Sequence, residues 1–123
     1  MKQISTNNAP AAIGPYSQAI VSGNLVYCSG QIPINPQTGE IPQGVQQQAH
    51  QALTNVKNLL SAAGTSIEKV IKTSVFIKDM NDFTAINEIY AQYFTEPFPA
   101  RSCVEVARLP KDVLIEIEVI AEI

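Results

Sequence analysis

One arginine and several carboxylates near the carboxyl end of the chain are the side chains best suited to chemistry. Arg101 and Cys103 lie in a strand-like run, Ala100–Ala107, and Glu116 lies in a second run, Val113–Ile123. An arginine fork can bind a carboxylate through two parallel hydrogen bonds, and a partly desolvated glutamate can position a water. This combination suits the hydrolysis of a small carboxylate-bearing electrophile without a metal or a covalent intermediate. A solvated sheet face with surface ion pairs is the alternative interpretation.

The motifs of several common chemistries are missing from the sequence. Gly14-Pro15-Tyr16 and Ser29-Gly30-Gln31 lack the spacing and the lysine of a phosphate-binding loop. A thiol nucleophile at Cys103 would need a neighbouring base, and nothing in the sequence places His50, the one histidine, beside it. With no second ligand at metal-binding spacing, we interpret His50 as a surface residue. We interpret Cys28 as a buried, inert thiol, and we expect no metal and no cofactor.

Composition limits the class of protein. A chain of 123 residues is expected to form one domain, residues 1–123. The net charge of −3 and the scattered Lys and Arg residues argue against nucleic acid as a partner. The low charged fraction of 15% suggests an apolar surface that other subunits cover. No apolar run approaches the roughly 18–20 residues of a membrane span, and the first residues lack a signal peptide's apolar core. We therefore expect a cytoplasmic protein without membrane contact, whose Cys28 and Cys103 are free thiols.

Periodicity predicts the elements that position these residues. We expect a short edge strand at residues 2–5, strands at 18–22 and 25–29, a loop at 32–44, a helix at 45–63, a strand at 70–78, a helix at 79–94 and strands at 100–107 and 113–123. The strand–helix–strand units predict parallel strands with right-handed crossovers. Two helices can cover only one face of such a sheet, so the other face needs a partner, which a symmetric oligomer would supply.

Side chains alternate between the two faces of a strand. In the last run, one face is apolar and comprises Val113, Ile115, Ile117, Val119, Ala121 and Ile123. Glu116, Glu118 and Glu122 lie on the other face, and composition alone does not separate Glu116 from Glu118 as the functional carboxylate. In the preceding run, Arg101, Cys103 and Glu105 share a face.

The most specific stretch of the sequence is PARSCVEVARLPKD followed by IEIEVIA, within residues 99–121. Four further segments accompany it: AAIGPYSQA (11–19), SGQIP (29–33), TSVFIKDMNDF (73–83) and INEIYAQYF (86–94). Together these segments resemble the Rid (RidA, YjgF-type) family of reactive intermediate deaminases. The resemblance implies an α+β fold, a chorismate-mutase-like mixed β-sheet with two helices packed on one face. It also implies a homotrimer with sites in the clefts between subunits, and a last strand inserted between two parallel strands.

The resemblance further implies roles for individual residues. Arg101 would bind the substrate carboxylate with the main-chain N–H of Cys103, Glu116 would engage the water or the imine nitrogen, and Tyr16, Ser29 and Asn87 would line the cleft. Without the resemblance, Tyr16 could be a core aromatic, Ser29 could satisfy a turn and Asn87 could be a solvated helix residue. The segment 95–99 is shorter than in some members of the family, so the resemblance does not predict the width of the cleft rim in this chain.

The predicted function is the hydrolysis of reactive 2-imino acids and enamines to 2-oxo acids and ammonia. The substrates would be 2-iminopropanoate and 2-iminobutanoate, which arise from 2-aminoacrylate and 2-aminocrotonate. The alternative is a non-enzymatic trimeric module that binds a small carboxylate and regulates a metabolic partner protein. Arg101 would serve either function, whereas only a deaminase would lose rate when Glu116 is changed. A ribonuclease activity, also attributed to the family, agrees least with the acidic pI of about 5.0.

Overall fold

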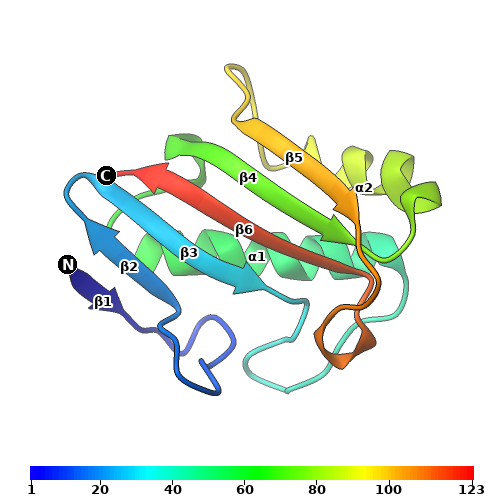
Figure 1. Ribbon diagram of the computed structural model, residues 1–123, viewed down its shortest axis with the longest axis horizontal. Helices are drawn as coiled ribbons and strands as arrows, with labels where there is room; N and C mark the ends of the chain where they lie inside the picture. Colours follow the sequence, from blue (N-terminus) through cyan, green and yellow to red (C-terminus); the bar gives the residue numbers. More distant parts are fainter.

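A six-stranded mixed sheet organises the chain, and the computed structural model describes all of residues 1–123 (Figure 1). In chain order the elements are β1 (Lys2–Ile4), β2 (Ala19–Ser22), β3 (Leu25–Gln31), α1 (Val45–Ala62), β4 (Val70–Ile77), α2 (Phe83–Tyr90), β5 (Ala100–Glu105) and β6 (Ile115–Glu122). Short 3₁₀ turns lie at Ile67–Lys69, Met80–Asp82 and Pro110–Asp112. The predicted order of strands and helices is therefore confirmed.

The last strand lies in the middle of the sheet. The strand order is β1-β2-β3-β6-β4-β5, and β6 is antiparallel to both β3 and β4. Strands β3 and β4 are therefore parallel to each other, and β4 is also parallel to β5. This confirms the expected insertion of the last strand between two parallel strands. It leaves β5 as a free edge of the sheet (Figure 1).

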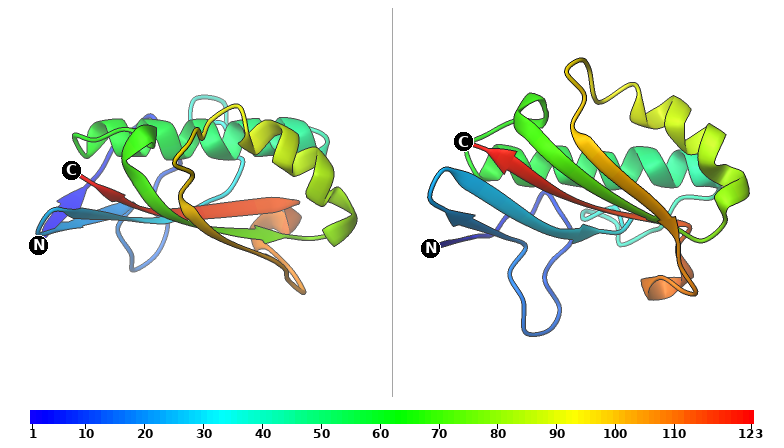
Figure 2. Two further views of the ribbon diagram at one scale, coloured as in Figure 1. Left: turned by 90° about the horizontal axis from the view of Figure 1, so that it is seen from above. Right: turned by 45° about the horizontal axis from the view of Figure 1, so that its top comes forward.

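Both helices lie on the same side of the sheet (Figure 2). Helix α1 begins after Gly44, whose positive φ of 83° suits glycine, and the chain leaves it at Gly64 as the sequence predicted. The buried stripe of α1 faces the sheet and includes Ala49, Ala52, Leu53, Val56, Leu59 and Leu60. No helix of the structure has both the length and the apolar character that a bilayer span requires.

The second helix is shorter than the predicted 79–94. It runs from Phe83 to Tyr90 and follows a 3₁₀ turn that Asp79 caps by accepting a hydrogen bond from the Asn81 N–H at 2.9 Å. After Tyr90 the N–H groups of Gln92 and Tyr93 bond three residues back, so the helix tightens into a turn. Apolar spacing continues through these residues because the turn also buries aromatic side chains, and the pattern therefore overestimates the helix.

The segment between the last two strands also differs from the prediction. Strand β5 ends at Glu105 and β6 begins at Ile115, so both are shorter than expected. A 3₁₀ turn at Pro110–Asp112 separates them, and Lys111 and Asp112 both have a φ of 55°, a left-handed conformation that an extended strand cannot contain. Ile123 is 51% exposed, so the predicted apolar face ends at Ala121.

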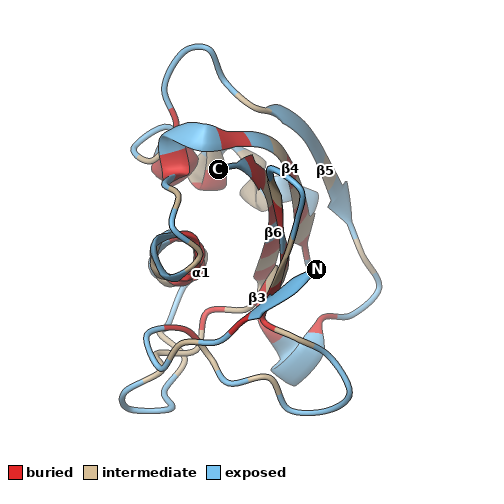
Figure 3. Cartoon of the chain, turned by 90° about the vertical axis from the view of Figure 1, so that its left-hand side faces the viewer, coloured by how far each residue is buried: buried red, intermediate tan, exposed pale blue.

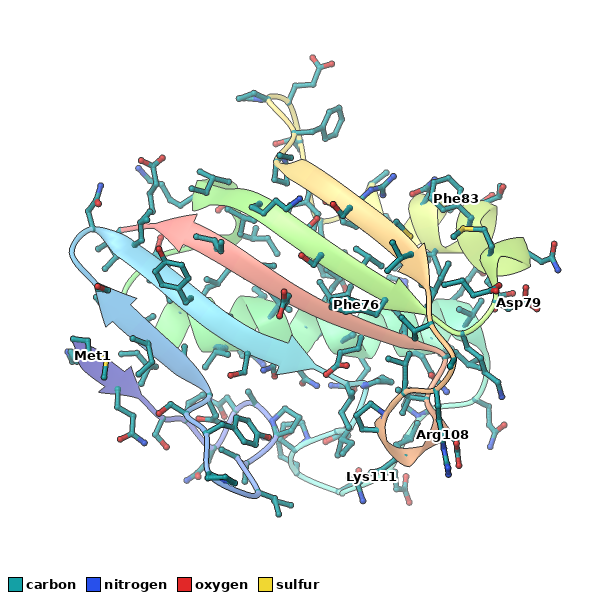
Figure 4. The ribbon with its side chains drawn as sticks, viewed as in Figure 1. Met1, Phe76, Asp79, Phe83, Arg108 and Lys111 are labelled. Atoms are coloured by element: carbon teal, nitrogen blue, oxygen red, sulfur yellow. The ribbon has the colours of Figure 1, made fainter.

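The two faces of the sheet have different surroundings. Ile115, Ile117 and Val119 are buried toward the helices, where buried residues gather between α1 and the sheet (Figure 3). Glu116 and Glu118 lie on the opposite, open face, together with Phe76, whose side chain points away from α1 (Figure 4). The expectation that two helices would cover one face only is confirmed.

Candidate functional site

Arg101 lies on the free edge strand β5, on the helix side of the sheet. Its Nη1 donates a hydrogen bond to Asn87 Oδ1 of α2 at 2.7 Å. Its guanidinium carbon lies 4.8 Å from the ring centroid of Tyr90 and 5.4 Å from that of Phe83. No carboxylate of the chain pairs with it, since the one salt bridge joins Arg108 to Asp112. Most of the five guanidinium donors therefore remain available to a ligand.

A surface cavity of about 490 Å³ adjoins this guanidinium. Its lining comprises Asn87, Tyr90, Ala91, Phe98, Pro99 and Arg101. Apart from the amide of Asn87 and the charge of Arg101, these side chains are apolar or aromatic. A small anion with a short apolar substituent would match such a lining.

Cys103 presents its main chain, rather than its thiol, to the same edge. The Val106 N–H donates to the Ile77 carbonyl at 2.9 Å, and N–H groups two residues apart in a strand point to the same side. The Cys103 N–H, at an odd number of residues from Val106, therefore points away from β4 into the open edge. Burial raises the pKa of the Cys103 thiol, which Arg101 only partly offsets, so the thiol is not an activated nucleophile.

Glu116 lies on the open face of β6, against the backbone of β3. A Cβ atom at Gly30 would lie 2.8 Å from the Glu116 Cδ atom, so the carboxyl group occupies space that only glycine leaves free. No hydrogen bond or salt bridge of the chain holds this carboxylate. Burial raises its pKa, and the neighbouring charge of Glu118 adds to the rise. A carboxyl group of this kind is suited to proton transfer nearer to neutral pH.

Tyr16 and Ser29 lie at the Gly30 end of the sheet. Tyr16 is 51% exposed and therefore not a core aromatic, and it lines a cavity of about 280 Å³ that Gly30 also lines. The Ser29 hydroxyl donates to the Ser17 carbonyl at 2.6 Å, and the Ser29 N–H donates to the Gln18 carbonyl at 2.9 Å. Ser29 thus fastens the loop that carries Tyr16 to β3.

The predicted site residues form two separate groups within one chain. Arg101 bonds Asn87 on the helix side of β5, and the Cys103 N–H points into the open edge of the same strand. Glu116 lies on the open face with Gly30, and β4 separates its strand from β5 (Figure 1). The geometry of one chain therefore does not bring Arg101 and Glu116 together.

Comparison with known proteins identifies the family. Residues 6–123 match the family model described as endoribonuclease L-PSP. The chain belongs to this family. It is the Rid (RidA, YjgF-type) family that the sequence motifs indicated, and that prediction is confirmed.

Individual members of the Rid family are similar to the chain over almost its whole length. The 2-iminobutanoate/2-iminopropanoate deaminase of Escherichia coli K12 is 59% identical over 123 residues, which cover 98% of this chain and 96% of the relative. The crystal structure of E. coli TdcF with bound serine has a TM-score of 0.96 and 56% identity, and it covers 100% of this chain and 99% of its own. That of the E. coli YjgF gene product has a TM-score of 0.95 and 58% identity, and it covers 99% of this chain and 98% of its own.

Two features of the site were missed from the sequence. Tyr90 and Phe83 were not counted among the site residues, although they lie three and four residues from Asn87 in a predicted helix and therefore on the same side of it. The contact between Gly30 and Glu116 had no local signal, because it joins two strands far apart in sequence.

The interpretation of His50 as a surface residue needs correction. It is half-buried, and its Nδ1 lies 2.9 Å from the Tyr93 hydroxyl. The reason is that α1 packs beside the turn that follows α2, which encloses the imidazole between them. Cys28 is buried as expected, and burial raises its pKa to about 12.

Proposed function

We propose that this chain is a deaminase that hydrolyses 2-imino acids, in particular 2-iminopropanoate and 2-iminobutanoate, to 2-oxo acids and ammonia. The observation that carries the proposal is the unpaired guanidinium of Arg101 beside the outward N–H of Cys103. Both groups are hydrogen-bond donors on one edge strand, and a carboxylate accepts donors of this kind. The 59% identity to a relative named as a deaminase of these two imines supports the choice of substrate.

The active site of this proposal lies between subunits of a homotrimer. Arg101 and Glu116 belong to opposite faces of one sheet, so they can meet only when the β5 edge of one subunit approaches the open face of the next. Such a head-to-tail contact repeats around a closed ring. The ring would also cover the open face, where Tyr27 and Ile120 line a cavity of about 400 Å³. Asn87 would support Arg101 from one side of the cleft, and Tyr16 and Ser29 would belong to the other.

The reaction follows from the chemistry of the two groups. Arg101 and the Cys103 N–H hold the substrate carboxylate, which fixes the neighbouring imine carbon. Water adds to that carbon while Glu116 takes its proton, and the electron pair of the C=N bond moves to nitrogen. Glu116 then returns that proton to the nitrogen, which gives a neutral carbinolamine. The hydroxyl proton next passes through Glu116 to the same nitrogen, the oxygen forms the C=O bond as the C–N bond breaks, and ammonia and the 2-oxo acid leave. The enamines 2-aminoacrylate and 2-aminocrotonate supply these imines by tautomerisation.

The proposed setting is the cytoplasm, where small-molecule imines form and where Cys28 and Cys103 remain free thiols. The net charge of −3 supports a small-molecule substrate rather than a nucleic acid.

A coupled assay tests the function. A threonine dehydratase reaction is followed by 2-oxobutanoate release with wild type, with Glu116→Gln and with Glu118→Gln, which removes a carboxylate from the same face of the same strand. We expect wild type and Glu118→Gln to accelerate release and Glu116→Gln to lose on the order of a hundredfold in rate. If wild type binds 2-oxobutanoate without accelerating its release, the chain is a binding module and not a deaminase.

Mixed subunits test the location of the site. Arg101→Ala and Glu116→Gln are each expected to be inactive, but a randomly mixed trimer places an intact Arg101 opposite an intact Glu116 at about a quarter of its interfaces. Refolding the two variants together should therefore restore about a quarter of wild-type activity. Two variants that stay inactive after mixing, in trimers shown to contain both, would contradict the intersubunit site.

A further inference from the structure

A tyrosine of α2 connects Arg101 to the middle of the sheet. The Tyr90 hydroxyl lies 2.8 Å from Thr73 Oγ1 of β4, and both residues are buried. Thr73 is the register partner of Arg101 in the β4–β5 pair. The Tyr90 ring faces the guanidinium at 4.8 Å, and Phe94 packs against the same ring with centroids 4.5 Å apart. The ring is thus fixed at its hydroxyl by β4 and at its face by a second aromatic.

Arg101 needs such support because its other contacts are few. Its side chain is exposed at a sheet edge, and its one hydrogen bond to the protein goes to Asn87. A long arginine side chain held at one point keeps much of its rotational freedom. An aromatic face within about 6 Å restricts the plane of the guanidinium while leaving its edge donors unused.

The supporting groups are also uncharged. An amide oxygen and aromatic rings hold Arg101, and burial raises the pKa of the Tyr90 phenol, so that this hydroxyl stays protonated beside the cation. An acidic side chain in the same place would occupy the fork and compete with an anionic ligand. Neutral support keeps the full positive charge available for the ligand carboxylate.

We propose that Tyr90, anchored by Thr73, is a positioning residue that holds the Arg101 guanidinium ready for the substrate carboxylate. This inference rests on the proposed function, because it concerns the same carboxylate-binding group. Neither Tyr90 nor Thr73 takes part in proton transfer. Their contribution lies in how well Arg101 is oriented before the ligand arrives.

The test removes the anchor without removing the ring. Tyr90→Phe deletes the hydroxyl, Thr73→Val deletes its partner, and the double variant deletes both. Tyr93→Phe is the matched control, because it deletes a tyrosine hydroxyl just beyond α2 that contacts His50 instead of the sheet. We measure, for each trimer, the affinity for 2-oxobutanoate, kcat, KM and thermal stability. Arg101→Ala shows how far binding falls when the guanidinium is removed completely.

We expect Tyr90→Phe and Thr73→Val each to weaken 2-oxobutanoate binding and raise KM by about five- to tenfold, with a smaller change in kcat. The double variant should bind 2-oxobutanoate no more weakly than either single variant, because the same single hydrogen bond is lost in all three. Its thermal stability should be higher than that of the single variants, since the double variant leaves no buried polar group unpaired. Tyr93→Phe should bind and turn over as wild type. In the Arg101→Ala background, Tyr90→Phe should have no further effect on binding.

Two results would overturn the inference. One is wild-type affinity and KM in Tyr90→Phe and Thr73→Val. The other is an affinity that recovers together with stability in the double variant, which would show that Tyr90 is only structural. If wild type binds 2-oxobutanoate but does not hydrolyse imines, the proposed function fails while the affinity series still decides the role of Tyr90. If wild type neither binds nor hydrolyses, both proposals fail.

Discussion

Replacing Gly30 with alanine would displace Glu116 without touching it directly. The new Cβ would lie 2.8 Å from Glu116 Cδ and 3.1 Å from Cγ, whereas nonbonded carbon atoms prefer about 3.5–4.0 Å. The carboxyl group must therefore move by roughly 0.7 Å or more, and its side chain is free to do so because no hydrogen bond or salt bridge holds it. Gly30 is not among the glycines with positive φ, so the backbone accepts alanine.

The size of the effect follows from this displacement. A catalytic group misplaced by about 1 Å can cost on the order of a hundredfold in rate, which corresponds to about 2.7 kcal/mol of transition-state stabilisation. We therefore expect Gly30→Ala to lower kcat/KM for imine hydrolysis by about ten- to a hundredfold. Affinity for 2-oxobutanoate should change little, because Arg101 lies in the other group of site residues. Stability should also change little, since alanine restricts the unfolded chain more than glycine does.

The assay is steady-state hydrolysis of the dehydratase-generated imine by Gly30→Ala, Glu116→Ala and the double variant. Glu116→Ala removes the atoms with which the new methyl group collides, so adding Gly30→Ala to it should cause no further loss. Wild-type activity in Gly30→Ala would refute the argument that the position of Glu116 limits the rate. An equal loss in both backgrounds would instead show that the surface of Gly30 itself contacts the reacting groups.

Four further expectations concern the assembly and its charged groups. Arg101→Ala should lower kcat/KM by at least about a hundredfold, since losing one partner of a desolvated charge pair costs roughly 2–5 kcal/mol. Arg101→Lys should restore little of this activity, because lysine lacks the planar fork. Steady-state kinetics measures both variants. Cys103→Ser should keep most activity, and a loss of several orders of magnitude in an intact trimer would indicate covalent thiol chemistry. The pKa of Glu116 is raised from 4.5, so wild type should lose stability relative to Glu116→Gln as pH rises from about 4.5 through the raised pKa. Below that window the two proteins should be equally stable. Urea unfolding at a series of pH values would show no such divergence if the Glu116 carboxyl group is not desolvated. Light scattering should give the mass of three 13.3 kDa chains, and a monomer at micromolar concentration would exclude the intersubunit site.

Local patterns predicted most of the elements because each depends on neighbouring residues. The alternation from Val113 to Ala121 placed Glu116 on the face opposite the core, and the structure agrees. The helix at 79–94 was overestimated because Tyr93 and Phe94 continue the apolar spacing through a turn. The insertion of the last strand depends on pairing between distant segments, and it followed from family resemblance and not from periodicity.

The site was only partly accessible to sequence reasoning for a similar reason. Alternation grouped Arg101 with Cys103, but it did not indicate which side of β5 faces the helices. An apolar pattern would place Val104 inward, yet Val104 is 44% exposed and Arg101 takes the helix side. Strand β5 is an edge strand that is not covered by α1. The side chain of Arg101 therefore contacts an amide and aromatic rings of α2 instead of a buried apolar core. The bond between Tyr90 and Thr73, 17 residues apart, has no periodic signature.

The way Arg101 is held has a consequence for Glu116 in the proposed cleft. A guanidinium free to rotate would pair with the nearest carboxylate of the neighbouring subunit, and an arginine beside Glu116 would lower its pKa. Burial and the charge of Glu118 raise that pKa in the single chain, which is the direction that proton exchange with a water and an amine requires. Asn87 and Tyr90 hold the cation on the helix side of its own sheet and so limit this pairing. In the proposed trimer, neutral support of Arg101 on one subunit would therefore keep the pKa of Glu116 on the next subunit raised.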